Sequence, residues 1–425
     1  MNTMTPRSSW WPQQLLLGWL NLVLTAPVIY LYVGLPLVMR QHGWSGTEIG
    51  LLQLAGLPAM LKFVLATPVD RWRLGQSSYR NWAVLLSVGY AATLLLLGAH
   101  DIRDTPFMVL FALALLVSLL GTWADIPVNG LAIRILPESE RIRAGAIRSA
   151  ATSLGAIVGG GLMLVLHAKL GWAWPFTVLA LGMLSGAILI PLLRAGHPVV
   201  NQPASAQEVA MERAGLRQWL SWFATPQHRI WAVLLVLYYP LIGAVWVYLK
   251  PLMLDLGFAP ERIAMIVGVG GGLLAAIASM AGSWVSRRSG AANALTLFAI
   301  GNLFALALLA SAVMFKLDEA WLIASTMVVA LMMGASAGLV FGLMMYHARP
   351  ALSALDYGIQ SSLFVIGRTM VPVLAGVVLD HLGYPGMLMC LVGGLALILV
   401  LVMFVRKRIF SASTGQQAQP LTSIQ

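Results

Sequence analysis

The sequence predicts an all-α membrane protein with twelve transmembrane helices in two six-helix bundles. Of its 425 residues, 59% are hydrophobic and only 10% are charged, which is far more apolar than a soluble domain. Apolar stretches of membrane-spanning length recur along the whole chain. One long polar stretch divides these segments six and six. Together, the three observations predict the fold class.

The predicted spans follow one another with short polar connections. Each is long enough to cross a hydrocarbon core of ~30 Å as a helix rising ~1.5 Å per residue. The first is too long for the apolar part of a cleaved leader, so we expect it to remain as a span. The twelve stretches lie near residues 14–39, 48–69, 81–99, 106–133, 144–168, 172–193, 230–254, 262–286, 291–315, 320–346, 353–379 and 384–405.

The basic residues follow the loops. The formal net charge is +11, and 17 of the 26 Lys and Arg residues fall in segments on the same side as the N-terminus, against five in the opposite loops. This positive-inside bias predicts that both termini are cytoplasmic. The charge therefore accounts for topology, and we expect no nucleic-acid partner.

The polar stretch 194–229 is the predicted cytoplasmic linker between an N-terminal bundle, 1–193, and a C-terminal bundle, 230–425. Three loop sequences recur in both halves, in the same order, at offsets of about 212 to 215 residues. They pair PLVMRQHGWSGTEIG with PLMLDLGFAPERIA, LPESERIRAGAIRS with RPALSALDYGIQSS, and HAKLGW with LDHLGY. The recurrence predicts an internal duplication and hence two pseudo-symmetric bundles.

Four charged residues lie well inside predicted spans, away from their ends. Lys62 precedes Asp70 by eight residues and Asp125 precedes Arg134 by nine, which places both side chains roughly 12 to 13 Å deep. Arg368 is equally interior, and Arg148 lies about two turns inside its span. Charge at such depth is costly and normally marks a path for a solute or ion.

Other chemistry finds little support. The phosphate-loop pattern G-x-x-x-x-G-K-[ST] is absent, so ATP hydrolysis by that route is excluded. The glycine runs GAIVGGG and GVGGG fall inside spans, where close helix contacts explain them better than nucleotide binding. Seven scattered histidines and one cysteine lack metal-ligand spacing. We expect no metal, no cofactor and no enzymatic activity.

The loop after the second span carries a family signature. ATPVDRWRLGQ, with Asp70 and Arg71, resembles the G-x-x-x-D-R-x-G-R loop of the major facilitator superfamily, and GSWVSRRSG, with Arg287, resembles its degenerate second copy. The first Gly is replaced by Ala66 and the second Asp by Ser286. The resemblance implies the major facilitator fold and a gating role for Asp70, Arg71 and Arg287.

Two further strings resemble one branch of that superfamily. LKFVLATPVDRW, from Leu61, and WADIP followed by ILPESER resemble the RhtX/FptX-type permeases for siderophores such as pyochelin and rhizobactin, and the related muropeptide permease AmpG. The chain length is closer to the siderophore branch. This resemblance implies a monomeric importer in the bacterial inner membrane, with both termini cytoplasmic. Its expected solute is a ferric siderophore, with a muropeptide as the alternative.

In this fold spans 1, 4, 7 and 10 face a central cavity and spans 2, 5, 8 and 11 flank it. The resemblance therefore implies a cationic, aromatic site for an organic anion. Its expected substrate-binding residues are Lys62, Arg148, Arg368, Trp123, Tyr30, Tyr239, Trp246 and Tyr346. Asp125, the single carboxylate deep within the spans, is the expected proton-coupling residue.

Plainer explanations stay open for these residues. Asp125 and Arg148 could neutralise each other, Lys62 could extend towards the membrane surface, and about half of the aromatic residues could serve packing. A receptor or regulator derived from a transporter, with no flux, is the alternative of another class.

Overall fold

The computed structural model describes residues 10–44, 48, 51–75, 77–193, 216–349 and 352–410. These residues form helices and turns, with no strand among them. The chain separates into two compact units: unit 1 comprises Met1–Gly215 with Phe341–Ser362, and unit 2 comprises Leu216–Val340 with Leu363–Gln425. Phe341–Ser362 thus packs with unit 1, although it belongs to the second half of the sequence. Residues 194–215 of the expected linker lie outside the described residues.

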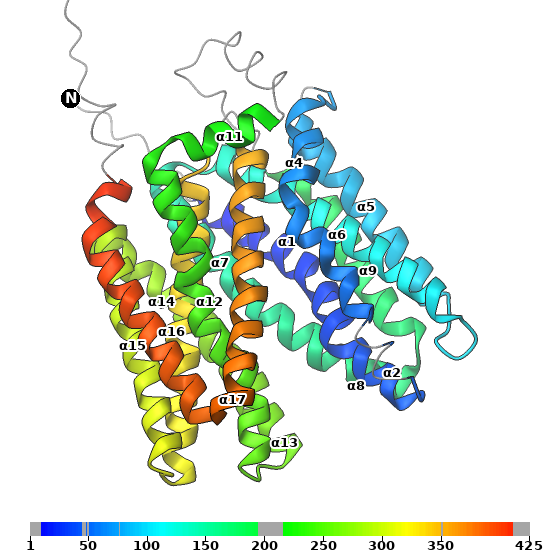
Figure 1. The fold of residues 1–425 in the computed structure, drawn as a ribbon. Helices are drawn as coiled ribbons and strands as arrows, with labels where there is room; N and C mark the ends of the chain where they lie inside the picture. Colours follow the sequence, from blue (N-terminus) through cyan, green and yellow to red (C-terminus); the bar gives the residue numbers. More distant parts are fainter. Residues whose placement is uncertain are drawn as a thin grey trace, which may run out of the picture. The chain divides into compact units, whose positions relative to one another are not determined.

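The helices of unit 1 pack into one bundle (Figure 1). α1 packs against α7 and α9, and α5 packs against α6 and α9. Large side chains such as Tyr30, Tyr90 and Phe176 are fully buried between them. In order, the elements of unit 1 are α1 (Trp11–Ile29), η1 (Tyr30–Gly34), α2 (Leu35–Gln41), η2 (Gln53–Leu61), α4 (Lys62–Arg71), α5 (Ser78–Gly98), α6 (Phe107–Ile135), α7 (Glu138–Ile157), η3 (Val158–Leu162), α8 (Met163–Leu170), α9 (Ala173–Leu189) and η4 (Ile190–Leu192).

The second predicted span is not one continuous α-helix. Its first part, η2, is a 3₁₀ helix that contains Pro58, and Leu61 then leaves the helical region with φ −104° and ψ 23°. Proline cannot donate the backbone hydrogen bond that an α-helix would require, which explains the tighter and irregular turn. Lys62 is the first residue of α4 and therefore lies directly at this break.

The glycine run that begins at Gly155 packs closely against α1, which confirms the structural explanation for it. A Cβ on Gly159 would meet the backbone of Ala26 and Tyr30, and one on Gly155 would lie 3.2 Å from Thr25. In the run that begins at Gly268, Gly271 packs on the ring of Trp246, whereas the space beside Gly268 is open.

Unit 2 has an apolar core between α12, α15 and α17. A cluster of buried residues in this core includes Ile242, Leu249, Leu306, Leu309 and Leu388. Its elements are α11 (Leu216–Ala224), α12 (Pro226–Asp255), α13 (Pro260–Ile263), η5 (Ala264–Gly270), α14 (Gly271–Ser289), α15 (Ala291–Met314), α16 (Glu319–Tyr346) and α17 (Ser353–Phe410), of which the last two also contribute the residues of Phe341–Ser362 to unit 1.

The described helices account for the twelve predicted spans. Ten are long and apolar enough to cross a membrane. One of these, the segment Ser353–Arg406, contains two spans, because Gly383 adopts φ 67° and breaks α17 at the predicted connection. The remaining span is the pair η2 and α4, whose irregular turn keeps it from forming one long helix.

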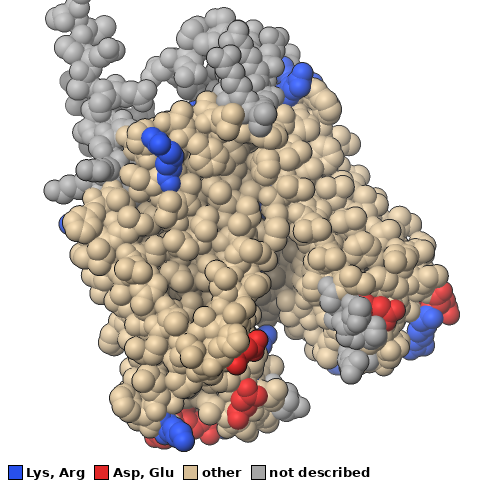
Figure 2. Space-filling view, in the orientation of Figure 1, with Lys and Arg blue, Asp and Glu red and all other residues tan. Residues whose placement is uncertain are grey.

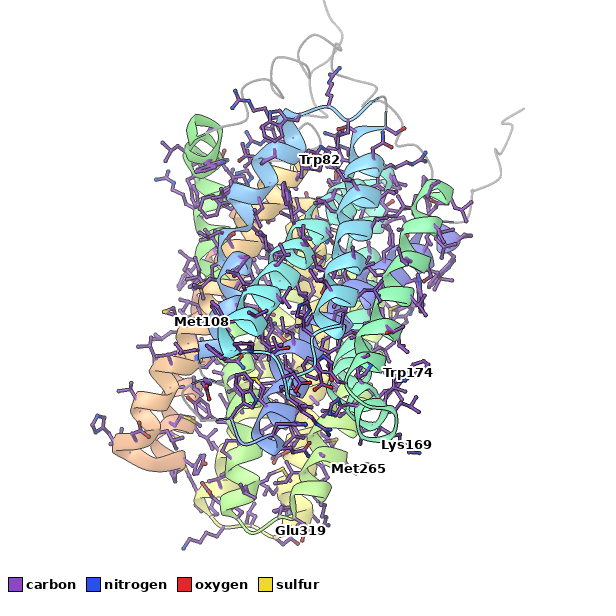
Figure 3. All side chains as sticks on the ribbon, turned by 90° about the vertical axis from the view of Figure 1, so that its right-hand side faces the viewer. Trp82, Met108, Lys169, Trp174, Met265 and Glu319 are labelled. Atoms are coloured by element: carbon purple, nitrogen blue, oxygen red, sulfur yellow. The ribbon has the colours of Figure 1, made fainter. Side chains whose placement is uncertain are left out.

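The positions of charged surface residues and of residues at helix ends agree with the assignment of twelve spans. On the face in Figure 2, Lys, Arg, Asp and Glu lie towards the ends of the helices, and the surface between is uncharged. Within unit 1, Trp82 lies near one end of the bundle (Figure 3). Met108, Lys169 and Trp174 lie further towards the other end. These residues belong to loops and helix ends that the sequence places on opposite sides of the membrane.

Small residues allow α14 and α16 to approach closely in unit 2. A Cβ on Gly334 would meet the backbone of Ala275, and Ser279 donates a 2.7 Å hydrogen bond to the Gly334 carbonyl. Between apolar helices in lipid, such packing and hydrogen bonding replace the hydrophobic driving force.

We expect Gly334→Val to destabilise unit 2 by about 1 to 3 kcal/mol, because the added side chain must push α14 and α16 apart. Thermal unfolding of the detergent-purified protein measures this. Gly393→Val is the matched control, because the space around Gly393 is open. Equal melting temperatures for the two variants would contradict close packing at Gly334.

Candidate functional site

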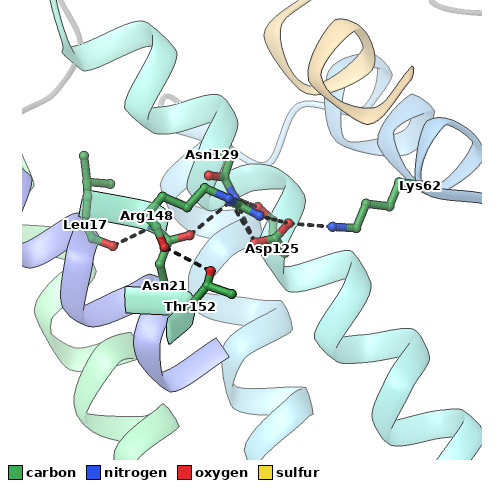
Figure 4. A network of polar contacts seen from close by, with 7 residues as sticks. All are labelled: Leu17, Asn21, Lys62, Asp125, Asn129, Arg148 and Thr152. Atoms are coloured by element: carbon green, nitrogen blue, oxygen red, sulfur yellow. Dashed lines mark hydrogen bonds and ion pairs between the residues drawn. The ribbon is translucent and has the colours of Figure 1, made fainter. Parts of the chain in front are cut away.

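A buried ion cluster lies in the middle of unit 1 (Figure 4). Asp125 of α6 pairs with two cations from different helices. Lys62 Nζ of α4 lies 2.7 Å from Asp125 Oδ2. Arg148 of α7 makes a two-point contact, with Nη1 3.1 Å from Oδ1 and Nη2 3.2 Å from Oδ2. We call these residues, with Asn21 and Asn129, the Asp125 cluster.

Two amide side chains complete the cluster. Asn129, one turn after Asp125, donates to Asp125 Oδ1 at 2.8 Å and to the Asp125 carbonyl at 2.7 Å. Asn21 of α1 accepts a 3.0 Å hydrogen bond from Arg148 Nη1 and donates to the Leu17 carbonyl at 2.7 Å. The cluster therefore connects α1, α4, α6 and α7.

Aromatic rings line the guanidinium of Arg148. It lies 5.1 Å from the ring centroid of Phe341 and 5.3 Å from that of Tyr357, both in the segment that packs with unit 1. Tyr357 is fully buried, and its hydroxyl has no hydrogen-bond partner among the described residues. A buried hydroxyl without a partner is energetically unfavourable, so this position favours an additional polar group.

The Asp125 cluster carries one excess positive charge, since Lys62 and Arg148 together face a single carboxylate. The relative exposed area of each of these three side chains is 10% or 11%. Electrostatic attraction is strong where water is scarce, so the cluster favours a solute with negative charge.

A second polar group surrounds Asp70 at the end of α4. Asp70 is fully buried and accepts hydrogen bonds from the Tyr79 hydroxyl and, at 2.6 Å, from the Leu355 backbone amide. Tyr79 in turn accepts from Ser353 at 3.1 Å, and the Arg134 guanidinium lies 3.9 Å from the centroid of the Tyr79 ring. Because Leu355 is in the first turn of α17, the Asp70 carboxylate caps the positive end of that helix.

The turn before α17 is held by its own ion pair. Arg349 donates from its backbone amide and from Nε to Asp356 Oδ2, each at 2.8 Å, and from Nη2 to Oδ1 at 2.7 Å. Burial alone would lower the pKa of Arg349, but the hydrogen bonds to Asp356 and the negative charges of Asp356 and Asp70 raise it overall. Arg349 is therefore charged at every physiological pH.

Unit 2 places a cation beside aromatic rings. Arg368 is exposed on α17, one turn beyond the buried Phe364. The ring of Phe364 lies 5.2 Å from that of Tyr239, and Arg368 is within electrostatic range of Tyr239. Trp246, also expected to bind substrate, is partly buried and packs on Gly271.

The other predicted residues occupy different surroundings. Tyr30 is buried between helices, with its ring 5.3 Å from that of Phe176, and is part of the packed core of unit 1. Trp123 packs beside Trp82 at 5.8 Å, because two residues along a helix turn it away from Asp125. Tyr346 is half-buried at the end of α16. The remaining two, Arg71 and Arg287, are exposed.

Five participants were not predicted from the sequence. Asn21 and Asn129 are amides inside apolar spans, a signal of the same kind as the charges, and Asn129 follows Asp125 by one helical turn. Tyr79, Ser353 and Tyr357 gave no such signal, because hydroxyl residues are common in spans and at their ends.

A comparison with family models decides the classification. Residues 17–363 match the model of the Major Facilitator Superfamily. The chain belongs to this superfamily. Its members are transporters, so the membership supports a membrane transport protein rather than an enzyme.

Known proteins resemble the chain over most of its length. An uncharacterised protein of Haemophilus influenzae is 24% identical over 380 residues, which cover 84% of this chain and 86% of that protein. The crystal structure of the transporter FucP in the outward conformation is similar, with a TM-score of 0.70, 18% identity and coverage of 92% and 98%. The human organic anion transporter MFSD10 gives a TM-score of 0.68, 16% identity and coverage of 92% and 97%. At these identities the structures establish the fold alone.

We expect Asp70→Asn to slow transport several-fold with a near-normal affinity for solute. An amide side chain is a weaker acceptor than a carboxylate for the Leu355 amide and caps α17 less well, which shifts the conformational equilibrium. Uptake kinetics separate the rate from the affinity. Asp104→Asn, in an exposed loop, is the control. A large loss of affinity in Asp70→Asn would contradict the gating role.

Proposed function

We propose that this protein is a secondary active transporter that imports an organic anion across the bacterial inner membrane by alternating access. Proton symport is the proposed energy source, with Asp125 as the coupling residue. The observation that carries the proposal is the Asp125 cluster, a buried group with one excess positive charge inside a transporter of this superfamily.

Arg368 adds to the preference for an anion. It is an exposed guanidinium beside Tyr239 and Phe364 in unit 2. A planar guanidinium next to aromatic rings favours a flat solute that carries a carboxylate or phenolate. The remaining candidates are Trp123, Tyr30, Trp246 and Tyr346. They contribute to the proposal less directly, because Tyr30 and Trp123 pack against neighbouring rings and Trp246 packs on Gly271.

The most specific form of the proposal is a ferric siderophore of the pyochelin or rhizobactin type. It is supported by residues 61–72 and 123–127, which resemble the siderophore permeases. A muropeptide is the second candidate, because the same residues resemble the muropeptide permease.

A flux assay with purified protein tests the proposal. Proteoliposomes with an imposed inward proton gradient are offered iron-loaded pyochelin or, separately, a muropeptide. We expect accumulation of the siderophore complex and none of the muropeptide. The opposite preference would favour the second candidate, and binding without flux would favour a receptor.

We expect Arg368→Ala to abolish uptake without a loss of expression, because the residue is exposed and makes no hydrogen bond or ion pair with the described residues. Arg368→Lys should restore uptake only partly, because it lacks the two-point planar donor. Radiolabelled uptake and direct binding measure both variants, with Arg103→Ala in an exposed loop as the control. Unchanged solute affinity in Arg368→Ala would remove it from the binding site.

We expect Asp125→Asn to keep solute exchange between equal compartments and to lose accumulation driven by the proton gradient. The substitution removes the single carboxylate of the cluster, and with it the proposed proton acceptor. Counterflow and gradient-driven uptake in proteoliposomes distinguish the two activities. Gradient-driven accumulation with unchanged pH dependence would show that Asp125 only neutralises its cationic neighbours.

A further inference from the structure

The two cations of the Asp125 cluster are held in different ways. Arg148 is fixed by a two-point contact to Asp125, by Asn21, and by the rings of Phe341 and Tyr357. Lys62 approaches from the side opposite to Arg148 and reaches Asp125 through its flexible side chain (Figure 4). An ammonium group on a four-carbon chain changes partners more easily than a planar guanidinium.

The backbone at Lys62 also permits movement. Lys62 begins α4 directly after the non-helical Leu61, at the junction with the 3₁₀ helix η2. Arg148 lies in the interior of the regular helix α7. Breaks of this kind in transmembrane helices occur where side chains or backbone meet a solute.

Lys62 and Arg148 also differ in how Asp125 balances their charges. The Arg148 and Asp125 contact is a neutral pair that satisfies both carboxylate oxygens. Asn129 adds a further hydrogen bond to Oδ1. Asp125 therefore keeps two partners if Lys62 leaves, and the excess positive charge of the cluster then belongs to Lys62.

From these contacts we infer that Lys62 is exchanged between Asp125 and the anionic group of the solute. In the absence of solute, Asp125 neutralises Lys62 inside the membrane. When an anion enters, Lys62 turns to it, while Arg148, Asn21 and Asn129 keep Asp125 in place. Arg148 is then a positioning residue. Tyr357, whose ring lies 5.3 Å from the Arg148 guanidinium and whose hydroxyl has no partner among the described residues, is a candidate for a further donor. The inference rests on the proposed function and specifies which residue of that site binds the anion.

Three variants separate the exchange from a general effect of charge. Lys62→Gln makes the cluster neutral and leaves Asp125 with Arg148 and Asn129, so we expect it to fold. Asp125→Asn leaves Lys62 without its carboxylate. The double variant Lys62→Gln/Asp125→Asn restores the single positive charge of the wild type but lacks the lysine. It is the matched control.

The probes are benzoate and its neutral analogue benzamide, added to the detergent-purified protein, with affinity taken from the shift of the melting temperature. We expect the wild type to bind benzoate but not benzamide. Lys62→Gln and the double variant should both lose roughly tenfold or more in benzoate affinity, the size of one charge-assisted hydrogen bond. Asp125→Asn should bind benzoate several-fold more tightly, because Lys62 no longer has to leave a competing carboxylate.

The outcomes distinguish this inference from the proposed function. If the double variant binds benzoate as tightly as the wild type, net charge alone attracts the anion, and the inference that Lys62 changes partners is wrong. Unchanged affinity in Lys62→Gln has the same meaning. If the wild type does not discriminate benzoate from benzamide, the anion site itself, and with it the proposed function, is wrong.

Discussion

The Asp125 carboxylate is the group on which the arrangement of helices around the candidate site of unit 1 depends. A lone charge at this depth would be strongly unfavourable, so the chain must supply partners from several helices at once. Lys62, Arg148 and Asn129 do so directly, and Asn21 does so through Arg148. The positions of α1, α4, α6 and α7 relative to one another are thereby tied to one anion. A change of partner at Asp125 would therefore alter the contacts among all four helices.

The two polar groups of unit 1 complement each other. Asp125 balances cations within the apolar interior. Asp70 balances the positive end of α17 and is within electrostatic range of Arg134 of α6. Both carboxylates receive side chains and amides from segments far apart in the sequence. Since α4 contains both Lys62 and Asp70, a rigid movement of this short helix would alter the two groups together. The proposed binding of solute at Lys62 would thus be coupled to the contacts of Asp70, which lies eight residues later on the same helix.

Much of the fold followed from the sequence, because apolar length and positive loops reflect the bilayer directly. The twelve spans and the superfamily were predicted correctly, while the break at Leu61 in the second span was not, although Pro58 gave a local reason for it. The charged members of the Asp125 cluster were predicted because charge is rare in lipid. Their exact pairing was left open, and the contact of Lys62 with Asp125 depends on tertiary packing that no local pattern contains. Tyr30 illustrates the same limit: its span was predicted to face a cavity, but its ring packs against Phe176.

The contrast between the two arginines explains why net charge alone is a poor guide to a binding site. Arg148 already contacts Asp125, Asn21 and two rings, so a solute would compete with strong contacts to bind it. Arg368 lies exposed beside Tyr239 and can meet an anion without losing a buried partner. Lys62 lies between these extremes, paired but on a flexible side chain at a helix break. A transporter must bind its solute and then release it, and a cation with an internal anion to return to satisfies both requirements. An unpaired cation at the same depth would bind more tightly and release more slowly.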